Sequence, residues 1–240
     1  MLAHPAVVTT VKLLASASAI YMTMSPLKDM EKVRAKVPIE SLPILCMFAN
    51  GCIWTLYGVL VANWFPLVVT NAINALLAVY YLAIMYTHGG PHRRVLAQKI
   101  VGTLAVVVGA IVYAAYGAYV LHNRDVAGHV GYLGIAVCTL MFGSPLAAVG
   151  TVVKKKSAAA LPLRLILAGV LCASLWFTFG LMISDPFVYG PNGLNLGLGL
   201  FQVFLCVYYR TPPTYKGIDT TTDDDDDDDL ALAKLNIGVL

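Results

Sequence analysis

The fold of this chain is decided by the stretch Leu175-Trp176-Phe177-Thr178-Phe179-Gly180, which is followed by Asp185-Pro186 and then by Gly190-Pro191-Asn192-Gly193. The stretch lies between two long apolar runs, yet it contains an indole, a carboxylate and a carboxamide. Polar groups at membrane depth are costly, so they indicate an internal site more often than chance would. A weaker copy occurs earlier, as Trp54-Thr55-Leu56-Tyr57-Gly58, Pro66 and Asn71. This duplication predicts an internally repeated membrane protein.

The composition of the 240 residues supports a membrane location. Hydrophobic residues make up 59% of the chain and charged residues only 12%, and the mean hydropathy is +0.76. A soluble domain carries roughly 25% charged residues. Seven of the 13 acidic residues form one run, 223–229, and the rest of the chain therefore has 16 basic and 6 acidic residues. The basic residues are scattered over short segments, so we expect no nucleic-acid partner.

The sequence gives no indication of an enzyme or of a cofactor. Its five cysteines lie in apolar runs without a CxxC pair, which is typical of packing residues and indicates neither a disulfide framework nor a metal site. The five histidines do not cluster, and the chain has no phosphate-binding glycine loop or GxSxG motif. We therefore predict that the protein is not an enzyme and binds no cofactor or metal.

Hydropathy predicts seven spans, each near the ~20 residues that a bilayer requires. The first apolar run lacks the charged start of a signal peptide and is interpreted as a retained helix. The spans are expected at approximately 5–26, 42–62, 65–87, 98–121, 130–151, 162–183 and 190–210.

Basic residues predict the orientation. The segments 27–41, 88–99 and 152–164 hold eleven of them, whereas the alternate segments hold only Arg124. By the positive-inside rule the first set is cytoplasmic, which places the N-terminus outside and the C-terminus in the cytosol. The Pro-, Thr- and Asp-rich tail, 211–240, is expected to be a disordered cytosolic segment.

The two halves repeat with a nearly constant offset. The matching residues, with their offsets, are Pro26 and Pro145 (119), Pro43 and Pro162 (119), Trp54 and Trp176 (122), Gly58 and Gly180 (122), and Asn71 and Asn192 (121). We therefore expect a first three-helix repeat at 1–87, a linker helix with its loops at 88–129, and a second repeat at 130–210. Three helices would invert the next unit, and the linker helix restores the same direction, so a pseudo-two-fold axis along the membrane normal is predicted.

This pattern resembles the SWEET sugar transporters, which have a 3+1+3 arrangement of helices and parallel repeats. The resemblance covers about residues 5–210 and rests on Ser25-Pro26, Pro43, Trp54 to Gly58 and Asn71, and on Ser144-Pro145, Pro162, Trp176, Phe179-Gly180, Asp185-Pro186-Phe187 and Pro191-Asn192-Gly193. The resemblance implies an all-α integral membrane fold with two parallel three-helix bundles. The chain departs from the family at Asn63, where an acid is common.

Candidate substrate-binding residues come in pairs. Asn71 and Asn192 offer two donors and two acceptor lone pairs each, which suits a neutral polyol; the alternative is an ordinary helix–helix hydrogen bond. Trp54 and Trp176 offer aromatic faces for a sugar ring; the alternative is an interfacial belt. The resemblance implies that bulky residues here accompany monosaccharides.

Further pairs are candidates for the pocket wall and for gates. Met22 and Met141 are candidates for the wall, or plain packing residues. Proline removes a helical N–H, so the four prolines at the predicted cytoplasmic ends are either an inner gate and hinge, as in the family's proline tetrad, or simple helix terminators. The prolines are Pro26, Pro43, Pro145 and Pro162. The resemblance implies an outer gate of Tyr57 and Asp185, although Asp185 alone also fits a solvated loop acid.

The predicted function is passive, bidirectional uniport of a sugar, with a monosaccharide such as glucose favoured. With no intramembrane acid pair, no proton relay is indicated. One alternative is an amino-acid exporter with Pro-Gln motifs, against which stand Pro26-Leu27 and Pro145-Leu146. A second is a seven-helix peptide-retrieval receptor, which requires buried Arg or Lys, and only Lys12 lies inside a span. The expected partners are the sugar, the lipid bilayer and, by resemblance, further copies of the chain, and the expected location is the plasma membrane.

Overall fold

The computed structural model describes residues 4–90, 93–158 and 161–209, which lie within one compact unit, Met1–Arg210. The described part is helical and contains no strand. It has seven helices or helix runs that are long and apolar enough to cross a membrane: Pro5–Arg34, Leu42–Leu60, Trp64–His88, Arg93–Val120, Val126–Lys155, Leu163–Met182 and Pro186–Tyr208. The predicted all-α, seven-span fold is confirmed. The predicted acidic tail lies outside the described residues.

The first repeat contains three spans, of which the first is kinked. Its elements are α1 (Pro5–Thr23), α2 (Leu27–Arg34), α3 (Leu42–Leu60), the π-helical turn η1 (Trp64–Val68) and α4 (Val69–His88). Pro26 separates α1 from α2, because it has no N–H to continue the helical ladder. Pro43 lies in the first turn of α3, where a missing N–H costs nothing.

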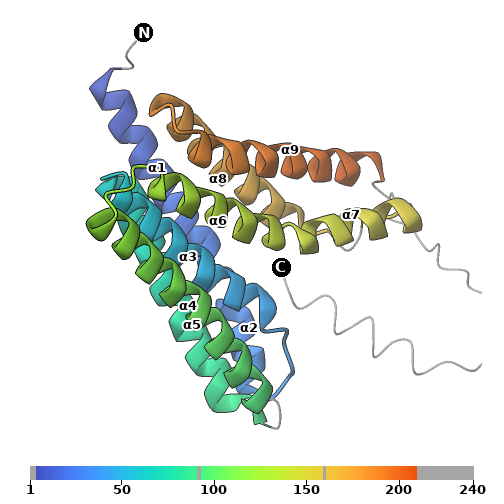
Figure 1. The fold of residues 1–240 in the computed structure, drawn as a ribbon. Coiled ribbons are helices and arrows are strands. Elements are labelled where there is room, and N and C mark those ends of the chain that lie inside the picture. Colours follow the sequence, from blue (N-terminus) through green and yellow to red (C-terminus); the bar gives the residue numbers. More distant parts are fainter. Residues whose placement is uncertain (1–3, 91–92, 159–160, 210–240) are drawn as a thin grey trace, which may run out of the picture. The chain divides into compact units, whose positions relative to one another are not determined.

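The linker helix and the second repeat follow. The linker is α5 (Arg93–Ala115), continued by η3 (Tyr116–Val120), and the second repeat consists of α6 (Val126–Met141), α7 (Gly143–Lys155), α8 (Leu163–Met182) and α9 (Pro186–Tyr208). Figure 1 shows α7 continuing from the end of α6, as α2 follows α1 in the first repeat. Pro162 is the N-cap of α8.

Helix α9 begins earlier than the hydropathy predicted. Asp185 caps the helix by accepting a hydrogen bond from the backbone N–H of Phe187 (2.9 Å), and Pro186 occupies the first helical position. Both residue types favour a helix start, so the segment expected as a loop up to residue 190 is the first turn of α9. Pro191 is buried inside the helix, which continues past it to Tyr208.

The helix pairs obey the predicted two-fold relation. Within the first repeat, α4 packs against α3 and α1, and within the second, α9 packs against α8 and α6. Between the repeats, α1 contacts α8 and α3 contacts α6. Because α6 is the counterpart of α1 and α8 the counterpart of α3, these two contacts are equivalent. Helix α5 lies against α3, α4 and α6 (Figure 1). The parallel arrangement of two three-helix bundles and a linker helix is therefore confirmed.

The core is shared at one end of the helices and divided at the other. We call the end near Tyr57 and Asp185 the Asp185 end, and the opposite end, near the four prolines, the proline end. A cluster at the Asp185 end joins both repeats and includes Ala15, Trp54, Tyr57, Val130, Trp176, Phe179 and Val188. Toward the proline end, one cluster around Tyr81 belongs to the first repeat with Leu96 of α5, and another around Val152 and Leu205 belongs to the second.

Candidate functional site

The two tryptophans occupy equivalent places between the repeats. Trp54 is 6% exposed and its indole lies against Gly134 of α6, where an added Cβ would be 3.1 Å from the ring. Trp176 is 7% exposed and donates its Nε1–H to the carbonyl oxygen of Ala15 in α1, at 3.0 Å. Ala15 and Gly134 are 119 positions apart, like the paired prolines. Each tryptophan thus reaches from its own repeat to a small residue in the first helix of the other.

The indole N–H groups are already used by the protein. Trp54 Nε1 donates to Asn50 Oδ1 at 3.1 Å, and Cys138 Sγ lies 3.2 Å from the same oxygen. Sequence reasoning missed Asn50, although its position one helical turn before Trp54 was the available signal. Since Trp176 Nε1 is also occupied, neither tryptophan has a free indole N–H for a ligand.

Each tryptophan is oriented by an aromatic neighbour one turn later. The Trp54 and Tyr57 ring centroids are 5.5 Å apart with an interplanar angle of 83°, and those of Trp176 and Phe179 are 5.9 Å apart at 86°. Edge-to-face packing of this kind is a favoured aromatic geometry. The two halves of the site therefore have the same internal geometry, even though Tyr57 carries a hydroxyl and Phe179 does not.

Asn71 and Asn192 hold the same local hydrogen bond. Each Nδ2 donates to the carbonyl oxygen four residues earlier, Leu67 or Val188, at 2.8 Å. Among the described residues, no buried side-chain nitrogen or oxygen lacks a hydrogen-bond partner. Because Oδ1 of neither asparagine accepts from the described protein, both oxygens must reach open space. The bond to the backbone fixes the carboxamide and leaves its oxygen and its second N–H for a ligand.

Tyr57 and Asp185 form a contact between the repeats at the Asp185 end. Tyr57 Oη lies 3.0 Å from Asp185 Oδ1 and 2.9 Å from Oδ2, and it donates to the carboxylate. Tyr57 also packs against Phe187, whose ring fills the space above Gly131. Asp185 therefore caps α9 and binds the other repeat at the same time.

The remaining candidates lie toward the proline end. Pro26 and Pro145 are half-buried at the α1–α2 kink and in the first turn of α7, whereas Pro43 and Pro162 are exposed. Met22 is half-buried against Gly169 of α8, while Met141 is 38% exposed. The structure thus places the methionines at equivalent chain positions but not in equivalent surroundings.

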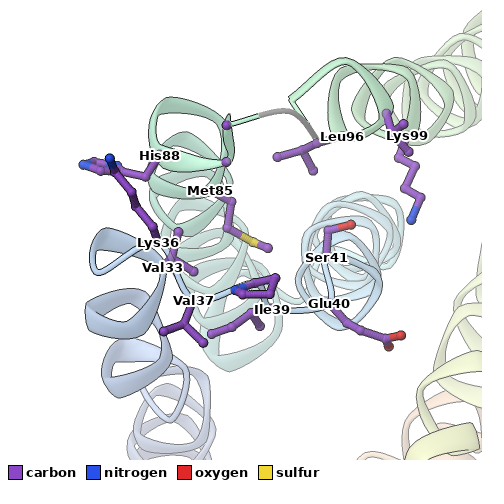
Figure 2. Close-up of a pocket in the computed structure, with 14 residues that line it drawn as sticks. Val33, Lys36, Val37, Ile39, Glu40, Ser41, Met85, His88, Leu96 and Lys99 are labelled. Atoms are coloured by element: carbon purple, nitrogen blue, oxygen red, sulfur yellow. The ribbon is translucent and has the colours of Figure 1, made fainter.

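A separate cavity of about 830 Å³ contains none of the predicted site residues. Figure 2 shows it among the end of α2, the segment before α3, the end of α4 and the start of α5, with Met85 and Leu96 pointing inward. Lys36, Glu40, His88 and Lys99 contribute charged or polar side chains. The cavity lies wholly in the first repeat and the linker helix, so it is not the predicted site between the repeats.

The matching family has the description "Sugar efflux transporter for intercellular exchange", and its match covers residues 9–94 and 128–214. The chain belongs to the SWEET family. The two matched segments contain both three-helix repeats and omit most of the linker helix.

Individual SWEET proteins are similar over most of their length. The bidirectional sugar transporter SWEET2b of Oryza sativa subsp. indica is 30% identical over 209 residues, which are 85% of this chain and 89% of that protein. The sugar transporter SWEET1 of Rattus norvegicus is 28% identical over 193 residues, 79% of this chain and 83% of that one. A solved eukaryotic SWEET transporter superposes with a TM-score of 0.73 and 26% identity, covering 85% of this chain and 97% of that one.

Proposed function

We propose that this protein is a passive, bidirectional sugar uniporter that works by alternating access and carries a monosaccharide such as glucose. The observation that carries the proposal is the core shared at the Asp185 end and divided at the proline end. Two equivalent bundles joined at one end only form a carrier that is closed on one side. The names of the similar SWEET proteins, which are sugar transporters, support a sugar as the cargo.

The sugar would bind between the repeats, against the two tryptophans and the two asparagines. The ring faces of Trp54 and Trp176 pack on its C–H groups, and Asn71 and Asn192 bond its hydroxyls. Both indoles are large and held in place, which narrows the space and favours a single sugar ring over a disaccharide. Met22 and Met141 would contribute apolar wall.

Transport then requires the two ends to alternate. The Tyr57–Asp185 hydrogen bonds close the outer end in this conformation, and they break when that end opens. At the inner end, Pro26, Pro43, Pro145 and Pro162 act as hinges, because each lies at or near the start of a helix and cannot continue the hydrogen-bond ladder from the segment before it. No proton is coupled, since the site as proposed holds no pair of intramembrane acids.

We infer the orientation from charge. Lys28, Lys32, Lys154 and Lys155 lie at the proline end, which makes that end cytoplasmic and the N-terminus external. The plasma membrane and a homo-oligomer are part of the proposal. Fluorescent tagging in intact cells and native mass spectrometry would test them, and a purely intracellular or monomeric protein would contradict the respective point.

Uptake of radiolabelled glucose and sucrose into proteoliposomes, with and without a proton gradient, tests the function. We expect glucose uptake that is indifferent to the gradient, little sucrose uptake, and loss of at least about 10-fold in rate for Asn192→Ala, because a site built for hydroxyls loses a hydrogen-bonding partner. Leu194→Ala, the neighbouring exposed position, is the control. Gradient-driven accumulation, or normal uptake by folded Asn192→Ala, would contradict the proposal.

A further inference from the structure

Each repeat carries a second asparagine one helical turn beyond the first. Asn74 follows Asn71 and Asn195 follows Asn192, each by three positions, and Asn74 and Asn195 are 121 positions apart, like the first pair. Residues three apart share a helix face and differ by a rise of about 4.5 Å along the axis. The four carboxamides therefore form two ranks, with the second rank nearer the proline end.

Asn195 lies on the inward face of α9. It is four positions after Pro191 and four before Gly199, and seven before Gln202, all of which are buried. The large exposed side chains on the other side of α9 are Leu200, Phe201, Phe204, Val207 and Tyr208, and exposed Leu194 lies about 100° from Asn195 around the axis. Despite its inward position, Asn195 is exposed. The space in front of it is therefore open and lies on the side of the other helices, not of the lipid.

The neighbouring polar groups on this face are all engaged with the protein, but Asn195 is not. Asn192 Nδ2 bonds to the Val188 carbonyl, and Gln202 Nε2 lies 3.4 Å from the Pro145 carbonyl. In the described part of the chain, Asn195 has no such partner. An unpaired carboxamide at membrane depth is costly, so its free side chain points to a polar occupant of that space.

In the first repeat, the equivalent asparagine, Asn74, has a hydrogen-bond partner within the protein. There Thr23 Oγ1 donates to Asn74 Oδ1 at 2.8 Å. The residue 119 positions after Thr23 is Phe142, which has no hydroxyl. The repeats therefore differ at this rank: Asn74 is bonded to its own bundle, whereas Asn195 is left without a partner.

We propose that Asn195 is a second sugar-binding position, one helical turn toward the proline end from Asn192. It bonds a hydroxyl of the sugar as the sugar passes between the first rank and the proline end. The inference rests on the proposed function. The offset between the ranks is comparable to the width of one sugar ring, so the sugar can exchange one carboxamide partner for the next without being left unbonded.

Thiol accessibility separates this role from a lipid-facing one. In proteoliposomes, Asn195→Cys and Leu194→Cys are each treated with a charged, hydrophilic methanethiosulfonate, and the wild-type chain with its five cysteines is the blank. Leu194 is the matched control because it is 69% exposed and its side chain points about 100° away from Asn195 around the helix axis. We expect Asn195→Cys to react at least about 10-fold faster than Leu194→Cys, since only a hydrated thiol ionises, and we expect glucose to slow the reaction.

Transport measurements complete the test. Asn195→Leu keeps the branching of the side chain but removes the hydrogen bond, and we expect the glucose KM to rise about 3- to 10-fold, while Leu194→Ala transports normally. The proposal is overturned if Asn195→Cys reacts no faster than Leu194→Cys, if glucose does not protect it, or if Asn195→Leu has a normal KM. If the wild-type protein moves no sugar at all, the proposed function fails first, and the uptake assay reveals that separately from the labelling rates.

Discussion

The two repeats have the same fold but hold it together with different bonds. In the first repeat, polar side chains join α1 to α4: Thr70 Oγ1 donates to Ser16 Oγ at 2.8 Å, Thr23 Oγ1 donates to Asn74, and Tyr81 Oη donates to the Thr23 carbonyl at 3.1 Å. The positions in the second repeat that correspond to Ser16, Thr23 and Thr70 are Ile135, Phe142 and Pro191. None of these three has a side-chain donor. The counterpart of Tyr81 is Gln202, whose Nε2 donates to the Pro145 carbonyl at 3.4 Å, so the second repeat keeps one of the three bonds.

At the Asp185 end, too, a polar contact occurs at only one of the two equivalent positions. Tyr57 and Asp185 bond across the repeats, while the positions 122 away from each are Phe179 and Asn63. The two-fold axis could support two such contacts, and the side chains complete one. The pseudo-symmetry therefore belongs to the backbone and to the aromatic and carboxamide pairs, whereas the gate contact and the polar bonds within a bundle are individual to each repeat.

The largest expected effect concerns the closest approach of helices in the first repeat. A Cβ on Gly51 would lie 2.8 Å from the Ala75 nitrogen and 2.9 Å from the Asn71 carbonyl oxygen, both backbone atoms that cannot move aside. We expect Gly51→Ala to cost about 3 kcal/mol, at the upper end of overpacking effects. The melting temperature in detergent, followed by fluorescence-detected gel filtration, measures this.

The second repeat supplies the comparison. The position 122 after Gly51 is Ala173, which is buried without a clash, so Ala173→Gly should cost only about 1 kcal/mol, the difference in helix propensity. Gly102→Ala, where nothing lies within 4 Å, is the control and should melt at the wild-type temperature or slightly above it. Equal losses for Gly51→Ala and Gly102→Ala would show that the close packing of α3 on α4 is not structurally important.

The next effect tests the single gate contact. Tyr57→Phe removes only the hydroxyl that donates to Asp185, and a hydrogen bond to a charged group contributes about 1.5–3 kcal/mol. We expect the equilibrium to shift roughly 10- to 100-fold toward separation of the Asp185 end. Spin labels at Ala62→Cys and Ser184→Cys, two exposed positions 122 apart, report that separation as a distance distribution once the native cysteines are replaced by alanine.

The missing contact can also be built. Phe179→Tyr together with Asn63→Asp places a phenol and a carboxylate at the positions equivalent to Tyr57 and Asp185. Two contacts should hold the Asp185 end closed more firmly and slow glucose uptake, whereas Phe179→Tyr alone should change little. If the double variant opens as readily as the wild type, the two-fold relation does not extend to the gate.

Sequence patterns could predict the spans and the repeat because both depend on local composition and on constant offsets. The paired asparagines and tryptophans were found in this way, and the constant offset of 119 could also have identified Ala15 and Gly134 as their opposite surfaces. The start of α9 was missed because hydropathy treats Asp185 and Pro186 as loop residues, although they are a helix cap and a first-turn proline.

Other features could not be predicted because they depend on contacts between distant segments. The spacing of four between Asn50 and Trp54 could have indicated their hydrogen bond, but nothing in the spacing indicates that the Trp176 N–H is used by a backbone oxygen of α1. Likewise, Asn74 and Asn195 are identical residues at equivalent positions, and only the packed structure shows that one is bonded and the other free. The division of the core into one shared and two separate clusters also emerges only from packing.

The smallest effect is expected from a substitution that makes the first repeat resemble the second at its second asparagine. Thr23→Val removes the hydroxyl bonded to Asn74, at a cost near the ~0.6 kcal/mol average for hydrogen bonds between membrane helices. It leaves Asn74 unpaired, like Asn195, so we expect a slightly lower melting temperature and a glucose KM that falls up to about 2-fold, because a second free carboxamide then faces the sugar path. Thr70→Val is the matched control, since it removes the Thr70–Ser16 bond of the same length and leaves Asn74 bonded. If both variants change the glucose KM equally, sugar binding does not depend on whether Asn74 and Asn195 have a hydrogen-bond partner within the protein.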